Sequence, residues 1–240
     1  MATWENFKSH VSSFSSAGAR KSPRDRYLFR GQGDAEWKLS STFDRAFAAV
    51  PLKKREKIAK QLLENFKREC EIYPDLKEIE SKEFALLALG QHHGLPTRLL
   101  DWTESPYVAA FFAFQGHLLH DTGSPSSRKR VAIWMLDRDV QHVWSGENGV
   151  ELVRPTGWHN DRLKRQVGWF TQSKVPFSCL EDYVASMQNP DKALSRVTLP
   201  ASEADKALAD LDLMEINARS LLGDLTGAAR SALVRTILTS

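Results

Sequence analysis

One segment, residues 91–113, constrains the fold more than any other, because it combines chain-breaking residues, polar side chains and a dense apolar block. Gly94 and Pro96 end the helix expected before them, since neither residue continues a helix well. A short apolar segment then leads to a polar triplet, and Ser105 and Pro106 are favoured as the N-cap and first residue of a following helix. The segment predicts a strand, a polar corner and a buried helix, an arrangement that often displays functional groups.

The composition indicates an ordinary globular protein. A chain of 240 residues can bury a sizeable core, and 42% hydrophobic with 26% charged residues is a usual balance. The formal net charge of +3 permits contact with nucleic acid without requiring it. Two cysteines, Cys70 and Cys179, exclude a disulfide framework and a thiolate metal set, so we expect a reducing, cytoplasmic location. The first residues lack a secretory leader and the densest apolar stretch, 108–114, is too short to span a membrane.

Residue periodicity predicts several short strands interrupted by helices, without the regular spacing of parallel β-α-β units. This pattern favours an α+β domain. Beside the strand that begins at Leu99, strands are expected at 27–31, 131–136, 150–153 and 194–199. Helices are expected at 55–73, 83–92, from 107 onward, 204–222 and 225–238. Residues 9–18 are expected to be a loose helix end or loop, and residues 121–130 a surface loop.

Arg30 and the adjacent glycines form the first candidate site. The sequence Phe-Arg-Gly-Gln-Gly at 29–33 places a guanidinium at the end of a strand, where glycines would let a ligand approach the backbone. The alternative is a surface arginine at a turn. His92 and His93 lack the i, i+4 spacing of a helical metal site, so we expect one of them to cap the helix or bond the turn, and we expect no metal.

Asp101, Trp102 and Thr103 supply a carboxylate, an aromatic plate and a hydroxyl in consecutive positions. In a strand, Asp101 and Thr103 would share one face and Trp102 the other. These side chains either contact a ligand, or Trp102 packs in the core while Asp101 or Thr103 caps the next helix.

Residues 160–171 combine basic side chains, an amide and two adjacent aromatic residues. Arg162 or Arg165 could hold a phosphate group, and Gln166 could orient a substrate hydroxyl or amide. A basic helix face that runs into a strand is the competing interpretation. The glycines of the chain form neither a phosphate loop nor a dinucleotide fingerprint.

Three motifs together resemble the family called the FRG domain: Phe-Arg-Gly at 29–31, residues 91–103, and residues 165–170. The resemblance runs from about residue 27 to 228 and implies a single domain over 1–240, with an N-terminal helix or arm at 1–20. Near its end the family usually carries an apolar-Pro-Asp-Leu-Asp-Gly sequence. Residues 221–227 depart from it, because they lack the proline and one acid.

The motif order is in turn similar to that of ADP-ribosyltransferases, which bind NAD with an arginine on a first strand, a Ser/Thr-containing second strand and a late Glu or Gln. Arg30, Thr103 and Gln166 take these positions and are the implied catalytic residues. The resemblance implies a split sheet of short strands flanked by helices, with NAD as the substrate and no metal. The implied NAD-binding residues are Arg30, Gly31, His93, Arg98, Asp101, Trp102, Thr103, Arg165 and Phe170.

Such an enzyme would cleave NAD and transfer ADP-ribose to a macromolecule, with RNA or DNA slightly favoured over protein. It could act as a toxin or phage-defence effector and have an antitoxin or regulatory protein as a partner. Arg30 would hold phosphate or the adjacent ribose, Trp102 or Trp169 would stack on a ring, and Thr103 and Gln166 would orient ribose hydroxyls.

Gln166 lacks the charge of the family's late glutamate, so a carboxylate would have to come from elsewhere, with Asp101, Glu151 and Glu181 as the candidates. Two alternatives remain at this point. One is an NAD glycohydrolase that shares the whole site. The other is a nucleotide- or nucleic-acid-binding module, whose phosphate patch would consist of Arg30, Arg98, Arg162 and Arg165.

Overall fold

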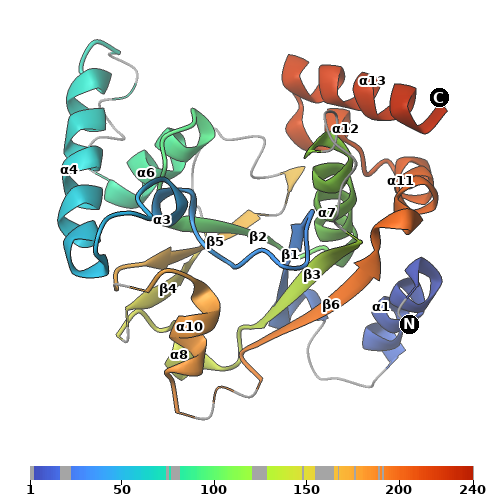
Figure 1. Cartoon of the computed structure of the whole chain (residues 1–240), viewed down its shortest axis with the longest axis horizontal. Helices are drawn as coiled ribbons and strands as arrows, with labels where there is room; N and C mark the ends of the chain where they lie inside the picture. Colours follow the sequence, from blue (N-terminus) through green and yellow to red (C-terminus); the bar gives the residue numbers. More distant parts are fainter. Residues whose placement is uncertain are drawn as a thin grey trace.

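The computed structural model describes residues 3–16, 23–73, 76, 82–120, 129–147, 149–154, 165–166, 168–175, 177–188, 190 and 192–239. They form one α+β domain built on a six-stranded antiparallel sheet with helices on both faces (Figure 1). The expected fold class is confirmed. The strands are β1 (Tyr27–Gln32), β2 (Leu99–Thr103), β3 (Arg130–Asp137), β4 (Val150–Val153), β5 (Gly168–Ser173) and β6 (Leu194–Pro200).

The sheet consists of two three-stranded halves that meet at a narrow junction. Its strand order is β4-β5-β2-β1-β3-β6, and within each half neighbouring strands pair along most of their length. Between the halves, β1 pairs with β2 at one position, Phe29 with Thr103. The expected split sheet is therefore a single sheet that is almost divided between β1 and β2.

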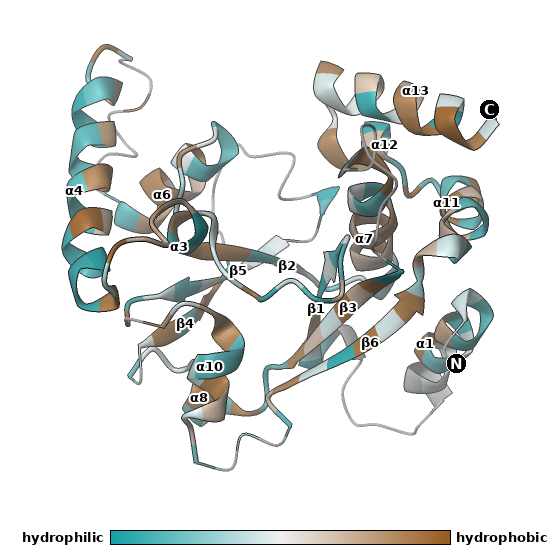
Figure 2. Cartoon of the chain, in the orientation of Figure 1, coloured by the Kyte–Doolittle hydropathy of each residue, from teal (hydrophilic) through white to brown (hydrophobic). Residues whose placement is uncertain are grey.

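One face of the sheet is covered mainly by a central apolar helix, α7 (Pro106–His120). Around it pack α1 (Trp4–Ser16), α11 (Ala204–Leu213), α12 (Ala218–Leu222) and α13 (Leu225–Thr239). The other face packs against α8 (Gln141–Trp144) and α10 (Leu180–Ala185). The remaining helices are α2 (Pro23–Arg26), α3 (Thr42–Ala46), α4 (Leu52–Cys70), α6 (Glu83–His92) and the 3-10 helix η2 (Ala201–Glu203). In Figure 2, α4 is largely hydrophilic with hydrophobic bands, as its amphipathic sequence predicts.

Gly31 in β1 and Gly33 directly after it allow a helix to pack closely, and ligand access to the backbone of Gly31, which also lines a pocket, stays a prediction. A Cβ atom at Gly31 would lie 1.9 Å from the backbone oxygen of Ala109 on α7. A Cβ atom at Gly33 would lie 2.7 Å from the carbonyl carbon of Gly116, further along the same helix. Because atoms cannot approach so closely, both positions require glycine for the close packing of β1 against α7.

Most expected elements are present, but some differ in bounds or number, and β5, α3, α8 and α10 were not among them. The helix expected at 204–222 is two helices, because Glu215 adopts a φ of 60° and Asn217 then caps α12 by accepting a hydrogen bond from the Ser220 amide. The described part of the segment expected as a loose helix end or loop, residues 9–16, is the end of α1, and the helix expected at 55–73 is α4, which spans Leu52–Cys70. Most of the expected 121–130 loop lies outside the described residues. None of the described helices is long and apolar enough to cross a membrane.

Candidate functional site

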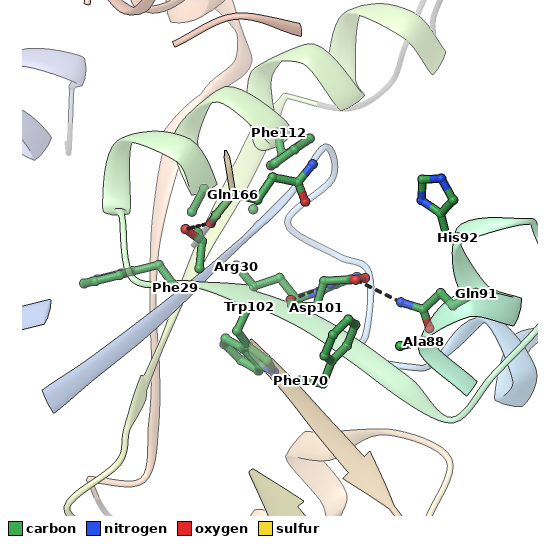
Figure 3. A pocket seen from close by; sticks show the side chains of 13 residues that line it. Phe29, Arg30, Ala88, Gln91, His92, Asp101, Trp102, Phe112, Gln166 and Phe170 are labelled. Atoms are coloured by element: carbon green, nitrogen blue, oxygen red, sulfur yellow. Dashed lines mark hydrogen bonds and ion pairs between the residues drawn. The ribbon is translucent and has the colours of Figure 1, made fainter. Parts of the chain in front are cut away.

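A pocket of about 340 Å³ lies at the junction of the two half-sheets, between α6 and α7 (Figure 3). Its walls come from β1, β2, α6, α7 and β5, and from the turn before β5. The lining residues are Phe29, Arg30, Gly31, Ala88, Gln91, His92, Asp101, Trp102, Thr103, Ala109, Phe112, Gln166 and Phe170. Arg30, Asp101, Thr103 and Gln166, far apart in sequence, therefore converge on one cavity, and their roles there remain predictions.

Arg30 bridges the gap between the two halves of the sheet. Pairing of β1 with β2 ends at Phe29, and the guanidinium of the next residue reaches β2, where Nη1 donates a 2.7 Å hydrogen bond to the backbone oxygen of Asp101. Nη1 also lies 3.6 Å from Oδ2 of Asp101. Burial lowers the pKa of Arg30 and the Asp101 charge opposes that shift, but an arginine stays protonated in proteins. The site therefore keeps a positive charge at the sheet junction.

The Arg30 guanidinium has donor capacity to spare. Its side chain is 21% exposed, and Nε has no hydrogen-bond partner among the described residues although the atom is buried. A buried, unsatisfied donor on a charged group is costly, so a movement of the side chain that brought Nε into contact with a ligand oxygen would be favoured.

Thr103 fixes the turn that carries Gln166. Its hydroxyl donates a 2.7 Å bond to the backbone oxygen of Gln166 and accepts a bond from the amide of Ser105. The hydroxyl proton and one of its two acceptor positions thus serve the fold, so Thr103 holds Gln166 at the pocket and has no proton left to donate to a ligand. The Gln166 side-chain amide donates to the backbone oxygen of Leu221 on α12 at 3.3 Å.

Several expected NAD-binding residues lie away from this pocket. His93 is an exposed residue that ends α6, and His92 lines the pocket in its place. Arg98 is buried, donates to the backbone oxygen of Val175 and lies 3.9 Å from Asp44, so it supports the fold on the α4 side. Arg165 is exposed and does not line the pocket.

The tryptophans expected to stack on a ligand ring have other partners. Trp102 lines the pocket but is 2% exposed, packs in the core and donates Nε1 to the Thr171 hydroxyl, which agrees with the core alternative for this residue, although Ser105 and not Asp101 or Thr103 caps the next helix. Trp169 pairs with Trp102 across the strands, so its ring lies on the same face of the sheet. Among the described pocket residues, the half-buried Phe112 supplies the aromatic wall closest to this role, whereas Phe170 is 2% exposed, like Trp102. The helix that follows Trp102 is capped by Ser105, which accepts a bond from the Val108 amide, as expected.

Asp101 supplies the one carboxylate among the described residues that line the pocket. The other two candidate carboxylates have partners elsewhere. Glu151 on β4 pairs with Lys174 at 3.1 Å, and Glu181 accepts a 3.0 Å bond from the Leu39 amide. Sequence reasoning missed Gln91, whose Nε2 donates a 2.9 Å bond to Oδ1 of Asp101. Its place at the start of the 91–103 motif was the signal that could have identified it.

No group of three or more His, Cys, Asp or Glu residues in the described part of the chain is arranged to hold a metal ion. The adjacent His92 and His93 rings lie 5.0 Å apart and perpendicular to each other.

The fold and the pocket define an α+β domain with a polar, aromatic-walled cavity at the junction of two half-sheets. Residues 25–122 match the model of the FRG domain, so the chain contains an FRG domain over these residues. This range includes the motifs at 29–31 and 91–103, whereas the resemblance at 165–170 falls outside it. No curated protein and no solved structure matches the chain.

Proposed function

We propose that this domain is an ADP-ribosyltransferase-like enzyme that cleaves NAD and transfers ADP-ribose to a macromolecule. The observation that carries the proposal is the convergence of Arg30, Asp101 and Gln166 in one pocket at the junction of the half-sheets. A guanidinium suits a pyrophosphate, a carboxylate suits a developing positive charge, and an amide suits ribose hydroxyls.

The pocket size favours one half of the dinucleotide. At about 340 Å³ the cavity is near the small end of the roughly 300–1,000 Å³ that ligand sites span. We place the nicotinamide–ribose half inside, with the nicotinamide against the half-buried Phe112, and the pyrophosphate at the part of the Arg30 guanidinium that lines the pocket. The adenosine half would extend out of the cavity.

The reaction breaks the bond between ribose C1′ and the nicotinamide nitrogen, and the electron pair leaves with nicotinamide. An oxygen or nitrogen of the acceptor then bonds to C1′ and gives up a proton. Positive charge develops on the ribose between these events, and the Asp101 carboxylate would stabilise it in place of the late glutamate. Gln166, held by Thr103, would orient the ribose.

The acceptor side of the proposal follows the resemblance. RNA or DNA is slightly favoured over protein, and action in the reducing cytoplasm as a toxin or defence effector, restrained by an antitoxin or regulatory protein, would suit such a reaction. The alternative binding module loses support, because Arg98 is buried on the α4 side and Arg165 does not line the pocket. Arg162 lies outside the described residues.

The test is incubation of the purified protein with NAD labelled in its adenylate phosphate, together with separate pools of RNA, DNA and protein. Released nicotinamide with label on one pool would support transfer and identify the acceptor. Released nicotinamide with free labelled ADP-ribose would indicate hydrolysis at the same site. If the protein neither binds NAD by calorimetry nor releases nicotinamide with any pool, the proposed function is wrong.

A further inference from the structure

A chain of side-chain interactions runs from the protein interior to Arg30. The Thr97 hydroxyl donates to Oε1 of Gln91, and Nε2 of Gln91 donates to Oδ1 of Asp101 at 2.9 Å. The other carboxylate oxygen of Asp101 lies 3.6 Å from Nη1 of Arg30 (Figure 3 shows the last three residues). The chain thus joins the 91–103 motif to the Phe-Arg-Gly motif on β1.

Thr97 and Asp101 together fix the Gln91 amide. The Asp101 carboxylate only accepts hydrogen bonds, so the amide NH₂ group must face it. The amide oxygen is then directed at Thr97, whose hydroxyl donates its proton to it and accepts a bond from the Leu99 amide. In the reverse orientation the amide oxygen would face the carboxylate, and that contact would be repulsive.

Of the side chains in this series of interactions, Thr97 is held in the interior, whereas Asp101 is exposed at the pocket. Thr97 is 2% exposed, and its backbone exchanges hydrogen bonds with Thr42 and with the amide of Phe43 at the start of α3. The Asp101 side chain, by contrast, is 56% exposed and would rotate freely into water without a partner. The bond from Gln91 therefore transmits the fixed position of Thr97 to the carboxylate.

We propose that Thr97 is a positioning residue, which acts through Gln91 to hold the Asp101 carboxylate and, through it, the guanidinium of Arg30. Thr97 does not line the pocket, so it touches no ligand there. The position of Arg30 is a property of the protein alone, whereas the consequence for NAD rests on the proposed function.

The first test reads the position of Arg30 without NAD. In ¹⁵N NMR spectra the Nε–H signal of Arg30 is assigned by its loss in Arg30→Lys, and its hydrogen exchange with water is measured. We expect exchange to rise about tenfold in Thr97→Val, which keeps the side-chain shape and loses the hydroxyl, and to return to the wild-type rate in Thr97→Ser. Unchanged exchange in folded Thr97→Val would overturn the proposal.

Two further variants make the result specific. Thr198→Val removes a hydroxyl that accepts a bond from Arg130 on the far half-sheet, so it is the same chemical change at a distant guanidinium and should leave the Arg30 signal unchanged. If Thr97→Val does not fold, Gln91→Met removes the middle of the chain while the backbone bonds of Thr97 remain. Gln91→Met should raise exchange at Arg30 by a similar factor, and unchanged exchange would again overturn the proposal.

The second test reads the consequence for the reaction. Thr97→Val should raise the KM for NAD about tenfold with a smaller change in kcat, and Thr97→Ser should restore it, because a misplaced Arg30 weakens binding more than chemistry. If the wild-type protein neither binds nor cleaves NAD, the proposed function fails, while the exchange measurement still decides whether Thr97 positions Arg30.

Discussion

At the scale of single residues, Arg30 is the side chain on which the proposed site most depends. A guanidinium offers a planar fork of donors, whereas an ammonium keeps the charge and loses the fork. Arg30→Lys should therefore weaken NAD binding by roughly 1.5–3 kcal/mol, about ten- to a hundredfold. Arg235→Lys on α13, whose side chain is 61% exposed, is the matched control. Calorimetry that gives equal affinities for both variants would remove Arg30 from the binding site.

Gln166 separates an enzyme from a binding protein. Gln166→Ala should lower turnover by roughly ten- to a hundredfold and change NAD affinity little, if the amide acts as charge develops. The bond from Thr103 is made to the backbone oxygen of residue 166, so it survives this substitution. Gln166→Glu should keep or raise turnover, because a carboxylate stabilises positive charge on the ribose. Full turnover of a folded Gln166→Ala variant would exclude the residue from catalysis.

Cys179 should be unreactive in the native protein. Burial raises the pKa of its thiol to about 12, so the reactive thiolate is scarce at pH 8. We expect alkylation by iodoacetamide at pH 8 to be roughly a thousandfold slower than in the unfolded chain, and to accelerate as the pH rises toward 12. Mass spectrometry of Cys179 labelling with time measures this, and rapid labelling of the folded protein would show that the thiol is accessible and ionised.

Which residues meet at the pocket could be predicted only in part. Arg30, Asp101 and Gln166 could be proposed because each follows a local signal, such as a strand end or a chain break. The burial of Arg98 could not, since it depends on Asp44 and Val175, which lie far away in sequence. His92 lines the pocket where His93 was expected. Successive residues on a helix point about 100° apart, so an error of one residue in the phase of α6 changes which side chain faces the pocket.

At the scale of elements, the contact between β1 and α7 depends on a pair of facing glycines. A Cβ atom at Gly33 would lie 2.7 Å from the α7 backbone, so Gly33→Ala should lower the free energy of unfolding by roughly 1–3 kcal/mol. A Cβ atom at Gly116 would lie 3.7 Å from Gly33, an ordinary contact, so Gly116→Ala should be neutral or stabilising by up to about 1 kcal/mol through helix propensity. Urea unfolding measures both changes, and equal effects would contradict this packing.

The elements were predictable where their boundaries are local. Gly94 and Pro96 end α6 and precede β2, and Ser105 and Pro106 begin α7, so this part of the fold follows from neighbouring residues. The break between α11 and α12 did not follow, because Glu215 has positive φ without the glycine that usually marks it. The pairing order of the strands depends on contacts across the whole chain, which no local pattern encodes.

At the scale of the whole molecule, the first helix is fixed to the last third of the chain. Trp4 on α1 is fully buried against α7 and donates Nε1 to Asp210 on α11 at 2.8 Å, and Lys8 donates to the same carboxylate at 2.6 Å. Trp4→Phe keeps most of the apolar burial and loses the hydrogen bond. It should lower the free energy of unfolding by roughly 1.5–3 kcal/mol at pH 7. Trp4→Ala should lower the free energy of unfolding by about 3–5 kcal/mol, because it also loses the buried ring. Urea unfolding measures both variants, and a loss in Trp4→Ala no larger than that in Trp4→Phe would show that the buried ring does not stabilise the fold.

The same contact predicts how stability depends on pH. The hydrogen bond from Lys8, followed by that from Trp4, lowers the pKa of Asp210 below its ordinary value of 3.8. A carboxyl group whose pKa is lowered by folding stabilises the protein above its ordinary pKa, and this contribution is lost as the pH falls toward the lowered value. Asp210→Asn should therefore be less stable than the wild type by a constant amount between pH 8 and 5, and the difference should shrink below about pH 4.

Asp205→Asn, at an exposed position on the same helix, controls for the loss of a charge. Urea midpoints at pH 7, 5 and the lowest pH at which both proteins unfold cooperatively measure the difference, and a gap that persists unchanged below pH 4 would show that the Asp210 charge does not hold α1 in place.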